Sequence, residues 1–497
     1  MYHNPIIRGF NPDPSVCVAN GKYYIAVSTF EYFPGVTVYE SDDLANWKYC
    51  DSILTKESQL DLDGCRNSSG VYAPTLRFHD GRFYMVTTNK NTGWNFIVHS
   101  DDINNGWSAP RLVVKMGIDP SLFFDEDGSC YYTSNGTLEG VRGIMGAHID
   151  PDTGILEEPL KLISRGCSGY ATEGPHIYKR NGWYYLLVSE GGTEYGHHCS
   201  ILRSRTIAGP YEENPANPIL SHTLRKGHRI QATGHADLLQ IDETRWIAVF
   251  LGVRLPGKAL LHNLGRETFL ASVTWRGDWP IIGNAGTVEE EMDDLGIDGN
   301  PVTSLSIEFS HPLSSYPLLT IRKPKPHCYR QNTSDATLTL LGEAPLSEPA
   351  GTPTLLAIRQ PEFDCVFEAT LALQGLVGKA GIAAWYNSDY HLKLQAGWTE
   401  AETIEVTLIR HLHDFESVTE TMMIHRPASE SINLKIVSNN EHYQFFCDGL
   451  ELGRASIATL CTEGTMYMTF TGAMFAIWAE TGEATFLDGI RLDTKTT

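Results

Sequence analysis

The sequence has no long apolar run, no excess of basic residues and no closely paired cysteines. Among its 497 residues 60 are acidic and 38 are basic, which gives a formal net charge of −22. A surface this acidic repels phosphate backbones and anionic lipid, so nucleic acid and membranes are not expected as partners. Because no stretch of about 18 apolar residues occurs, no membrane-spanning helix is predicted either.

The cysteines and the first residues both favour a cytoplasmic location. The ten cysteines are scattered singly, without a C-x-x-C pair. The opening residues lack the basic stretch and apolar run of a secretory signal. Reduced thiols in a cytoplasmic protein are therefore expected. The chain is also longer than one hydrophobic core usually serves, so two domains are predicted.

A repeat organises roughly the first 280 residues. A turn residue followed by aromatic and apolar residues recurs at Gly21, Gly81, Gly128, Gly182 and, more weakly, Glu243. Each copy is typical of a tight turn that enters a β-strand. The copies are 47 to 61 residues apart, which is the size of a propeller blade. The repeat thus predicts five blades.

A short segment that starts a strand lies eight or nine residues before each turn. The residues at the start of these segments are Asp13, Ala73, Asp119, Glu173 and His235. In a propeller this strand is the innermost one, so its first residue lies at the mouth of the axial channel. Proline is tolerated at a strand start, and turn chemistry explains the Asp-Pro pairs. A purely structural role would favour Ser, Thr or Asn, because clustered carboxylates raise one another's pKa. A functional cluster is the preferred interpretation.

The last third of the sequence has a different pattern. After Trp279-Pro280 the repeat fades, and short segments of alternating polar and apolar residues follow. These predicted strands are Cys365–Leu373, Ala380–Tyr386, His391–Ala396, Thr403–Arg410, Ile432–Val437, Tyr443–Cys447, Thr465–Phe470 and Met474–Ala479. Even spacing without helical periodicity indicates a β-sandwich. We predict an all-β chain with a propeller over 1–300, a linker over 301–325 and a sandwich over 326–497.

Three carboxylates and a histidine at a channel mouth suit the hydrolysis of a glycosidic bond. This reaction needs one carboxylic acid to protonate the leaving oxygen and one carboxylate to activate water or to attack carbon. Asp13 has little apolar bulk beside it in the sequence and is a candidate for the ionised group. Glu173, with Asp119 as a neighbour, is a candidate for the protonated one. Residue chemistry alone does not separate these roles.

Motifs along the whole chain resemble those of glycoside hydrolase family 43. The similarity lies in Asn11–Ser15, Ser28–Val36, Asp119–Ser121, Thr172–His176, Gly234–Ala236 and Leu264–Thr268. The nearest members are β-xylosidases and α-L-arabinofuranosidases. The resemblance implies a five-bladed propeller with a concanavalin-like sandwich and an inverting mechanism. It implies that Asp13 is the general base, that Glu173 is the general acid, and that Asp119 raises the pKa of the acid and orients it.

The same resemblance assigns roles to His235 and Arg266. Arg266 would lie against the sugar and the catalytic carboxylates; the alternative is an exposed ion pair with Glu267. His235 would bond Asp13, or hold a divalent cation such as calcium through water in the axial channel, as in some relatives. Otherwise it is a packing residue. No cofactor is expected to be required, and no metal-ligand spacing indicates a catalytic metal.

Three aromatic residues are expected to surround the sugar. Phe30 and Tyr72 correspond to pocket-wall positions in the family, and aromatic faces suit the C–H surface of a sugar. Tyr72 departs from the tryptophan common in β-xylosidases, and core packing is the alternative for both residues. Phe470 is expected on a loop of the sandwich that closes the pocket, which favours removal of a terminal sugar.

The predicted activity is therefore that of an exo-glycosidase. It would release terminal β-D-xylosyl or α-L-arabinofuranosyl residues from short hemicellulose oligosaccharides. An endo-acting arabinanase and a catalytically inactive carbohydrate-binding protein are the alternatives. The choice between xylose and arabinose stays open, as does association into a homo-oligomer.

Overall fold

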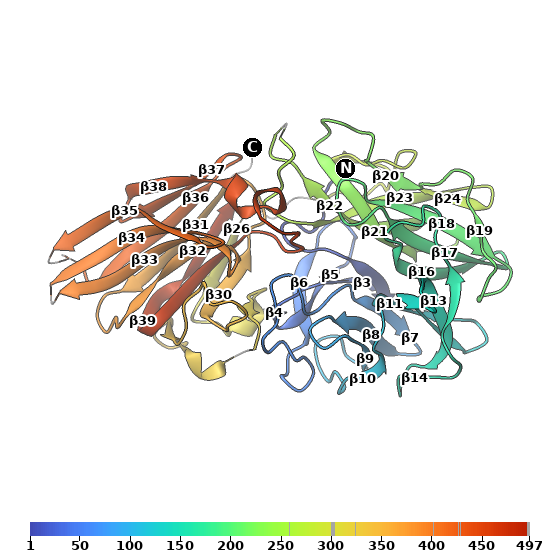
Figure 1. The fold of residues 1–497 in the computed structure, drawn as a ribbon, viewed down its shortest axis with the longest axis horizontal. Helices are drawn as coiled ribbons and strands as arrows, with labels where there is room; N and C mark the ends of the chain where they lie inside the picture. Colours follow the sequence, from blue (N-terminus) through green and yellow to red (C-terminus); the bar gives the residue numbers. More distant parts are fainter. Residues whose placement is uncertain are drawn as a thin grey trace.

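The computed structural model describes residues 1–494 except 258, 300–303, 324, 401, 426 and 428. It contains two β domains that lie side by side, with the propeller in blue to green and the sandwich mainly in orange to red (Figure 1). No α-helix occurs in this described part of the chain, which holds only four 3-10 turns. These short turns are too short to cross a bilayer, and the described residues contain no candidate membrane-spanning helix. All ten cysteines are free thiols.

Five antiparallel sheets form a closed ring. Their innermost strands are β2 (Ser15–Ala19), β7 (Thr75–His79), β11 (Ile118–Phe124), β16 (Glu173–Arg180) and β21 (Ile230–Gln240). Each of these strands contacts the next, and β21 contacts β2. The strands therefore surround one axis, and the predicted five-bladed propeller is confirmed.

The outer strands complete the blades. They are β3 (Lys22–Val27), β5 (Gly35–Ser41) and β6 (Lys48–Leu54) in the first blade; β8 (Arg82–Asn89), β9 (Trp94–Ser100) and β10 (Arg111–Val114) in the second; β12 (Cys130–Leu138), β13 (Val141–Asp150), β14 (Ile155–Leu156) and β15 (Lys161–Ser164) in the third; β17 (Trp183–Glu190), β18 (His198–Ser204), β19 (Glu212–Glu213) and β20 (Leu220–Ser221) in the fourth; and β22 (Trp246–Arg254), β23 (Glu267–Arg276) and β24 (Trp279–Ile282) in the fifth.

Local sequence explains the first hairpin of several blades. At Asn20-Gly21, Asp80-Gly81 and Asn181-Gly182 both turn residues have positive φ. A two-residue turn of this kind matches the twist of the strands it joins, and Asn-Gly and Asp-Gly are its preferred pairs. The ring is tied at its end by the N-terminal segment, in which β1 (Tyr2–His3) pairs with β25 (Glu291–Met292).

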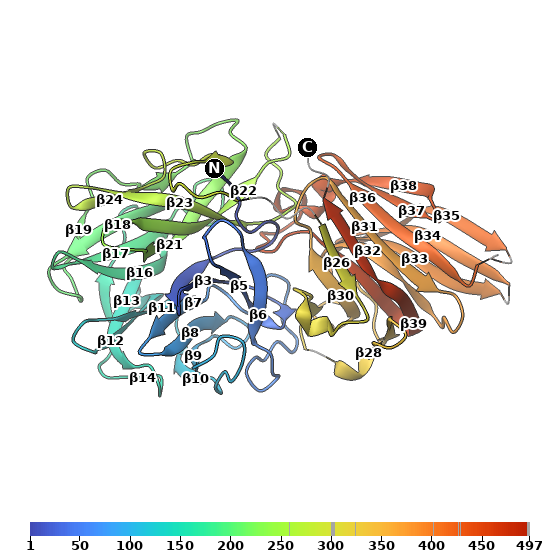
Figure 2. The ribbon, with the colours of Figure 1, turned by 180° about the vertical axis from the view of Figure 1, so that it is seen from behind.

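The C-terminal domain is a two-sheet sandwich built around one long strand. Its strands are β26 (Ser304–Glu308), β28 (Tyr329–Asn332), β29 (Thr337–Gly342), β30 (Thr354–Arg359), β31 (Cys365–Ala372), β32 (Lys379–Asn387), β33 (Tyr390–Glu400), β34 (Thr403–Leu412), β35 (Phe415–His425), β36 (Ser431–Ser438), β37 (His442–Cys447), β38 (Leu450–Ser456) and β39 (Met474–Thr494). The first part of β39 pairs with β30 and β32, and the second part with β26, β29 and β31. Figure 2 shows β39 crossing the domain.

Two expectations for this domain need correction. Residues 465–470 form no strand; they belong to a loop after the 3-10 turns η3 (Ile457–Leu460) and η4 (Thr462–Gly464). Part of the expected linker, residues 304–308, is β26 and pairs with β39. Some positions of the three predicted segments lie outside the described residues. They are residue 300 of the propeller, residues 301–303 and 324 of the linker, and residues 495–497 of the sandwich.

The two domains share a buried apolar cluster. Phe10, Phe30 and Tyr32 of the propeller pack there with Trp385 and Trp478 of the sandwich. Strand β4 (Tyr32–Phe33) also pairs with β27 (Thr320–Ile321), which lies between η1 (Leu313–Ser315) and η2 (Pro326–Cys328). This shared core fixes the sandwich against the side of the propeller on which Phe30 lies.

Candidate active site

Four of the five residues predicted at the strand starts lie at backbone irregularities in or just before the innermost strands. Asp13, two residues before β2, has φ 54°, Asp119 has φ 55° and His235 has φ 51°. The ladder register breaks at Asp119 and His235, and again directly after Glu173. β-Bulges commonly re-aim a side chain beside an active site. The irregularity therefore turns these side chains out of the ladder.

All eight predicted site residues line one cavity of about 250 Å³. They are Asp13, Phe30, Tyr72, Asp119, Glu173, His235, Arg266 and Phe470. Seven of these residues come from the propeller and Phe470 comes from the sandwich. The structure thus brings together side chains from three innermost strands, from the segment just before β2, and from a loop more than 200 residues further along the chain.

Asp13 lies in a site that favours its ionised form. Arg266 Nη1 donates to Asp13 Oδ1 at 2.8 Å, and Ser28 Oγ donates to Oδ2 at 2.6 Å. His235 Nδ1 lies 3.9 Å from Oδ1. Burial alone would raise the pKa of Asp13, but Arg266, His235 and Ser28 together outweigh it and hold the pKa below the usual range of an aspartate. Asp13 is therefore a carboxylate at neutral pH.

Glu173 lies in a site that favours its protonated form. Burial raises the pKa of Glu173 to about 8, and the neighbouring carboxylates of Asp119 and Asp13 add to the effect. Asp119 also has a raised pKa, because burial and Asp13 outweigh His235 and the backbone N–H of Gly174, which donates to Asp119 Oδ2 at 3.1 Å. The pocket thus holds one ionised and one protonated carboxyl group near neutral pH, an arrangement suited to acid and base roles.

Arg266 joins the two domains across the pocket. Its Nη1 also donates to Thr193 Oγ1 at 3.0 Å, and its Nη2 donates to the backbone oxygen of Phe470 at 3.1 Å. The alternative of an exposed ion pair with Glu267 is wrong, because Arg266 is only 7% exposed and Glu267 pairs with Arg254. Arg266 therefore fixes the sandwich loop and Asp13 with a single guanidinium group.

Three aromatic rings form one wall of the cavity. The ring of Phe30 lies 5.2 Å from that of Tyr72 and 5.9 Å from that of Phe470, centroid to centroid. All three rings also pack in or against the apolar cluster between the domains. Phe30 and Tyr72 therefore both line the pocket and contribute to core packing. A wall of this kind offers apolar contact to the C–H face of a sugar.

Sequence reasoning missed several residues of the site. Thr193 and the preceding Gly191-Gly192 line the cavity, and the paired glycines directly after a strand were an available signal. His197 was also missed: it is fully buried next to Gly234, where an added Cβ would lie 1.9 Å from its ring. No local sequence signal connects these two residues, which meet only in the fold.

The residues around His235 offer few direct side-chain ligands to a divalent cation. Both oxygens of Asp13 already accept hydrogen bonds, one of them from a guanidinium group. Among the described residues, the only group of three side chains with metal-ligand geometry is His327, Cys328 and Glu343 in the sandwich. There Glu343 is already paired with Lys325 and His327. No set of three side-chain ligands for a directly bound calcium ion lies near His235 in the described part of the chain, and the expected cation held through water stays a prediction.

Comparison with known proteins identifies the family. Residues 2–280 match the model of glycosyl hydrolases family 43, and residues 306–486 match that of the β-xylosidase C-terminal concanavalin A-like domain. The chain belongs to glycosyl hydrolases family 43. It is 35% identical over 492 residues to the non-reducing end α-L-arabinofuranosidase BoGH43B of Bacteroides ovatus, covering 96% of this chain and 91% of that protein.

Two further relatives are named for a different activity. A β-xylosidase of Bacillus subtilis is 32% identical over 476 residues, which covers 89% of this chain and 88% of that one. The crystal structure of xylan β-1,4-xylosidase from Bacillus halodurans C-125 superposes with a TM-score of 0.91 at 31% identity, over 99% of this chain and all of that one. Family 43 membership makes the protein a glycoside hydrolase, and the domain match confirms the concanavalin-like sandwich.

Proposed function

We propose that this family 43 hydrolase is an inverting exo-glycosidase that releases terminal β-D-xylosyl or α-L-arabinofuranosyl residues from short oligosaccharides. The observation that carries the proposal is the pair of carboxyl groups with opposite protonation states, Asp13 and Glu173, in one cavity. The full-length similarity to enzymes named for both sugars supports the substrate class.

The groups act in a single displacement. Glu173 donates its proton to the glycosidic oxygen as the bond from that oxygen to the anomeric carbon breaks. Asp13 accepts a proton from a water molecule as the water oxygen forms its bond to the same carbon from the opposite face. The products are a sugar of inverted configuration and the shortened oligosaccharide. Inverting enzymes hold the two carboxyl groups about 6.5–9.5 Å apart, which leaves room for the water.

The sandwich loop favours exo action over endo action. Phe470 stands against Phe30 and Tyr72, and Arg266 holds its backbone, so one side of the cavity is closed by the second domain. An endo-acting arabinanase needs a groove open at both ends. The presence of all three carboxylates and of Arg266 argues against an inactive binding protein. A cytoplasmic location and a homo-oligomeric state stay predictions.

Two isosteric substitutions test the proposed roles. Glu173→Gln and Asp13→Asn should each lower kcat by about 10²–10⁴-fold, because each removes one arm of acid–base catalysis. Glu173→Gln should retain much more activity on a dinitrophenyl glycoside, whose leaving group needs no proton. Asp13→Asn should be reactivated by azide, which attacks without a base, and should yield a glycosyl azide of inverted configuration.

The outcomes separate the alternatives. Retained activity of Glu173→Gln on unactivated disaccharides, or a product of retained configuration from the wild type, contradicts the mechanism. Parallel kinetics on p-nitrophenyl β-D-xylopyranoside and p-nitrophenyl α-L-arabinofuranoside decide the sugar. Internal cleavage of linear arabinan would favour the endo-acting alternative.

A further inference from the structure

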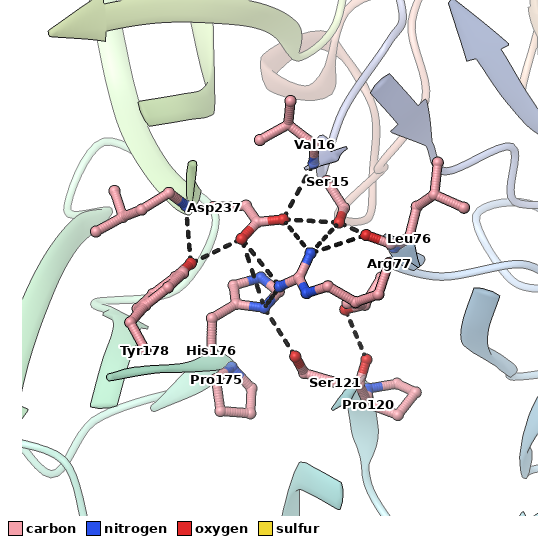
Figure 3. Close-up of polar contacts among 12 residues, drawn as sticks. Ser15, Val16, Leu76, Arg77, Pro120, Ser121, Pro175, His176, Tyr178 and Asp237 are labelled. Atoms are coloured by element: carbon pink, nitrogen blue, oxygen red, sulfur yellow. Dashed lines mark hydrogen bonds and ion pairs between the residues drawn. The ribbon is translucent and has the colours of Figure 1, made fainter. Parts of the chain in front are cut away.

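A second ring of polar residues lies on the propeller axis beneath the strand-start residues. This axial layer consists of one residue per blade: Ser15, Arg77, Ser121, His176 and Asp237 (Figure 3). Four of them follow Asp13, Asp119, Glu173 and His235 by only two or three positions in the sequence. The axial layer and the catalytic groups are therefore joined by very short pieces of backbone.

Asp237 is the hub of the axial layer and is fully buried. Its Oδ2 accepts from Ser15 Oγ at 2.7 Å, from the Val16 backbone N–H at 3.0 Å and from Arg77 Nη1 at 2.7 Å. Its Oδ1 accepts from Arg77 Nη2 at 3.0 Å and from Tyr178 Oη at 2.7 Å. Bidentate pairing of this kind is both strong and geometrically specific. Asp237 thus connects the first, second and fourth blades to its own.

Arg77 extends the network to the remaining blade. Its Nη2 lies 3.0 Å from His176 Nδ1, and Ser121 Oγ lies 2.9 Å from the same nitrogen. Because a guanidinium group can only donate, His176 Nδ1 is an acceptor and the ring is neutral. Burial lowers the pKa of His176 to about 3, and Arg77 adds to this against the opposing effect of Asp237. All five blades are therefore joined by one hydrogen-bonded network.

This network lies beside His235, the residue expected to hold a channel cation through water, because Asp237 follows His235 by two residues on β21. The positive charge on the axis is the guanidinium of Arg77, and the layer's carboxylate uses both oxygens on donors from the chain itself. We infer that the Arg77–Asp237 pair replaces an axial metal ion in this protein and acts as a positioning pair for Asp13, Asp119, Glu173 and His235. The inference rests on the proposed function of those groups.

The arrangement predicts which kinetic constant depends on the pair. Other groups that line the sugar site, such as Arg266 and Phe470, lie on segments outside the innermost strands. Loss of the pair should therefore displace the acid and the base while leaving sugar binding nearly intact. A displacement of about 1 Å can cost about 10²-fold in rate.

The test compares two isosteric substitutions at buried ion pairs. Asp237→Asn breaks the axial pair, and Glu480→Gln breaks the Lys393–Glu480 pair of the sandwich, whose side chains are 4% and 12% exposed. Both should lower the Tm. Asp237→Asn should also lower kcat by about 10- to 100-fold with KM within about threefold, whereas Glu480→Gln should leave both constants unchanged. An Asp237→Asn variant that melts earlier but keeps wild-type kcat overturns the positioning role and leaves the hydrolase function untouched.

Further variants keep the inference testable if Asp237→Asn does not fold. Ser15→Ala removes one hydrogen-bond donor to Asp237 without a change of charge. It should lower kcat by a smaller factor than Asp237→Asn does. Arg77→Ala should be partly reactivated by millimolar guanidinium chloride and not by sodium chloride. Unchanged kcat in Ser15→Ala together with no guanidinium effect in Arg77→Ala overturns the proposal.

Metal dependence gives an independent readout. Wild-type Tm and kcat should be the same in EDTA and in millimolar calcium, and calorimetric titration with calcium should show no binding. A calcium-dependent rise in Tm or kcat that is lost in a His235→Ala variant would show that a metal ion binds on the axis. That result would overturn the inference that the Arg77–Asp237 pair replaces a metal ion.

Discussion

At the scale of single residues, the site separates two chemically similar groups by their surroundings. Asp13 faces a guanidinium group and a hydroxyl donor, whereas Glu173 faces two other carboxyl groups. The pKa of Asp13 is consequently lowered and that of Glu173 raised to about 8. Pairs of titratable groups whose pKa values are pushed apart in this way mark acid and base assignments. Neither the lowered pKa of Asp13 nor the raised pKa of Glu173 follows from the residue types of the motifs alone.

These shifts predict the pH dependence of kcat/KM. The proposed mechanism requires Glu173 to be protonated, so activity should fall as the pH rises through about 8. It also requires Asp13 to be ionised, so the acid limb should lie below the usual titration range of an aspartate, because the pKa of Asp13 is lowered. Asp119→Asn removes the largest electrostatic cause of the raised pKa of Glu173 and should move the basic limb to lower pH. Asp125→Asn, at an ion-paired carboxylate outside the cavity, is the control. A basic limb that Asp119→Asn leaves in place contradicts the assignment.

At the scale of elements, the irregularities of the innermost strands decide where the side chains point. The bulge at Gly234 also places His235 over Gly174 and leaves room for the buried ring of His197. Gly234 is required there for space: its backbone is not in the left-handed region, but an added Cβ would overlap His197.

This packing predicts the effect of Gly234→Ala. The methyl group should force the His197 ring or the β21 backbone to move, which costs about 1–3 kcal/mol of unfolding free energy. Because His235 is the next residue, kcat should fall as well. The double variant Gly234→Ala/His197→Ala should recover part of the stability, since removal of the ring makes room for the methyl group. Thermal and urea unfolding measure both effects, and additive losses in the double variant would contradict the overlap.

The elements that the sequence predicted well are those with a buried face. Alternation of apolar residues located β31, β34 and β36, because one side of each strand packs in the sandwich core. Strand β35 was missed because it is a largely exposed edge strand. Residues 465–470 were wrongly predicted as a strand because their alternating apolar residues do not share one buried face. Met466 is 77% exposed, while Phe470 packs against the propeller. The strand-start residues were located from spacing, whereas their bulges and the axial network depend on contacts between blades.

At the scale of the whole molecule, the sandwich contributes to the site and also stabilises the junction. Arg322, which is fully buried, donates to Asn67 Oδ1 of the propeller at 2.8 Å and to the Gly351 backbone oxygen of the sandwich at 2.6 Å. The next propeller residue, Ser68, accepts a hydrogen bond from the Phe470 backbone N–H at 2.9 Å. The junction therefore holds the loop that carries Phe470 at a fixed position over the pocket.

Substitution of Phe470 tests whether this closure serves catalysis. Phe470→Ala removes a ring that contacts Phe30 and Tyr72 but leaves the backbone bonds to Arg266 and Ser68 in place. Loss of such an aromatic contact, at most about 1.5 kcal/mol, should lower kcat/KM on short oligosaccharides by up to about 10-fold, mainly through KM. Met466→Ala on the same loop changes an exposed side chain outside the cavity and should have no effect. Wild-type kcat/KM in Phe470→Ala would show that the sandwich supports the propeller without forming part of the sugar site.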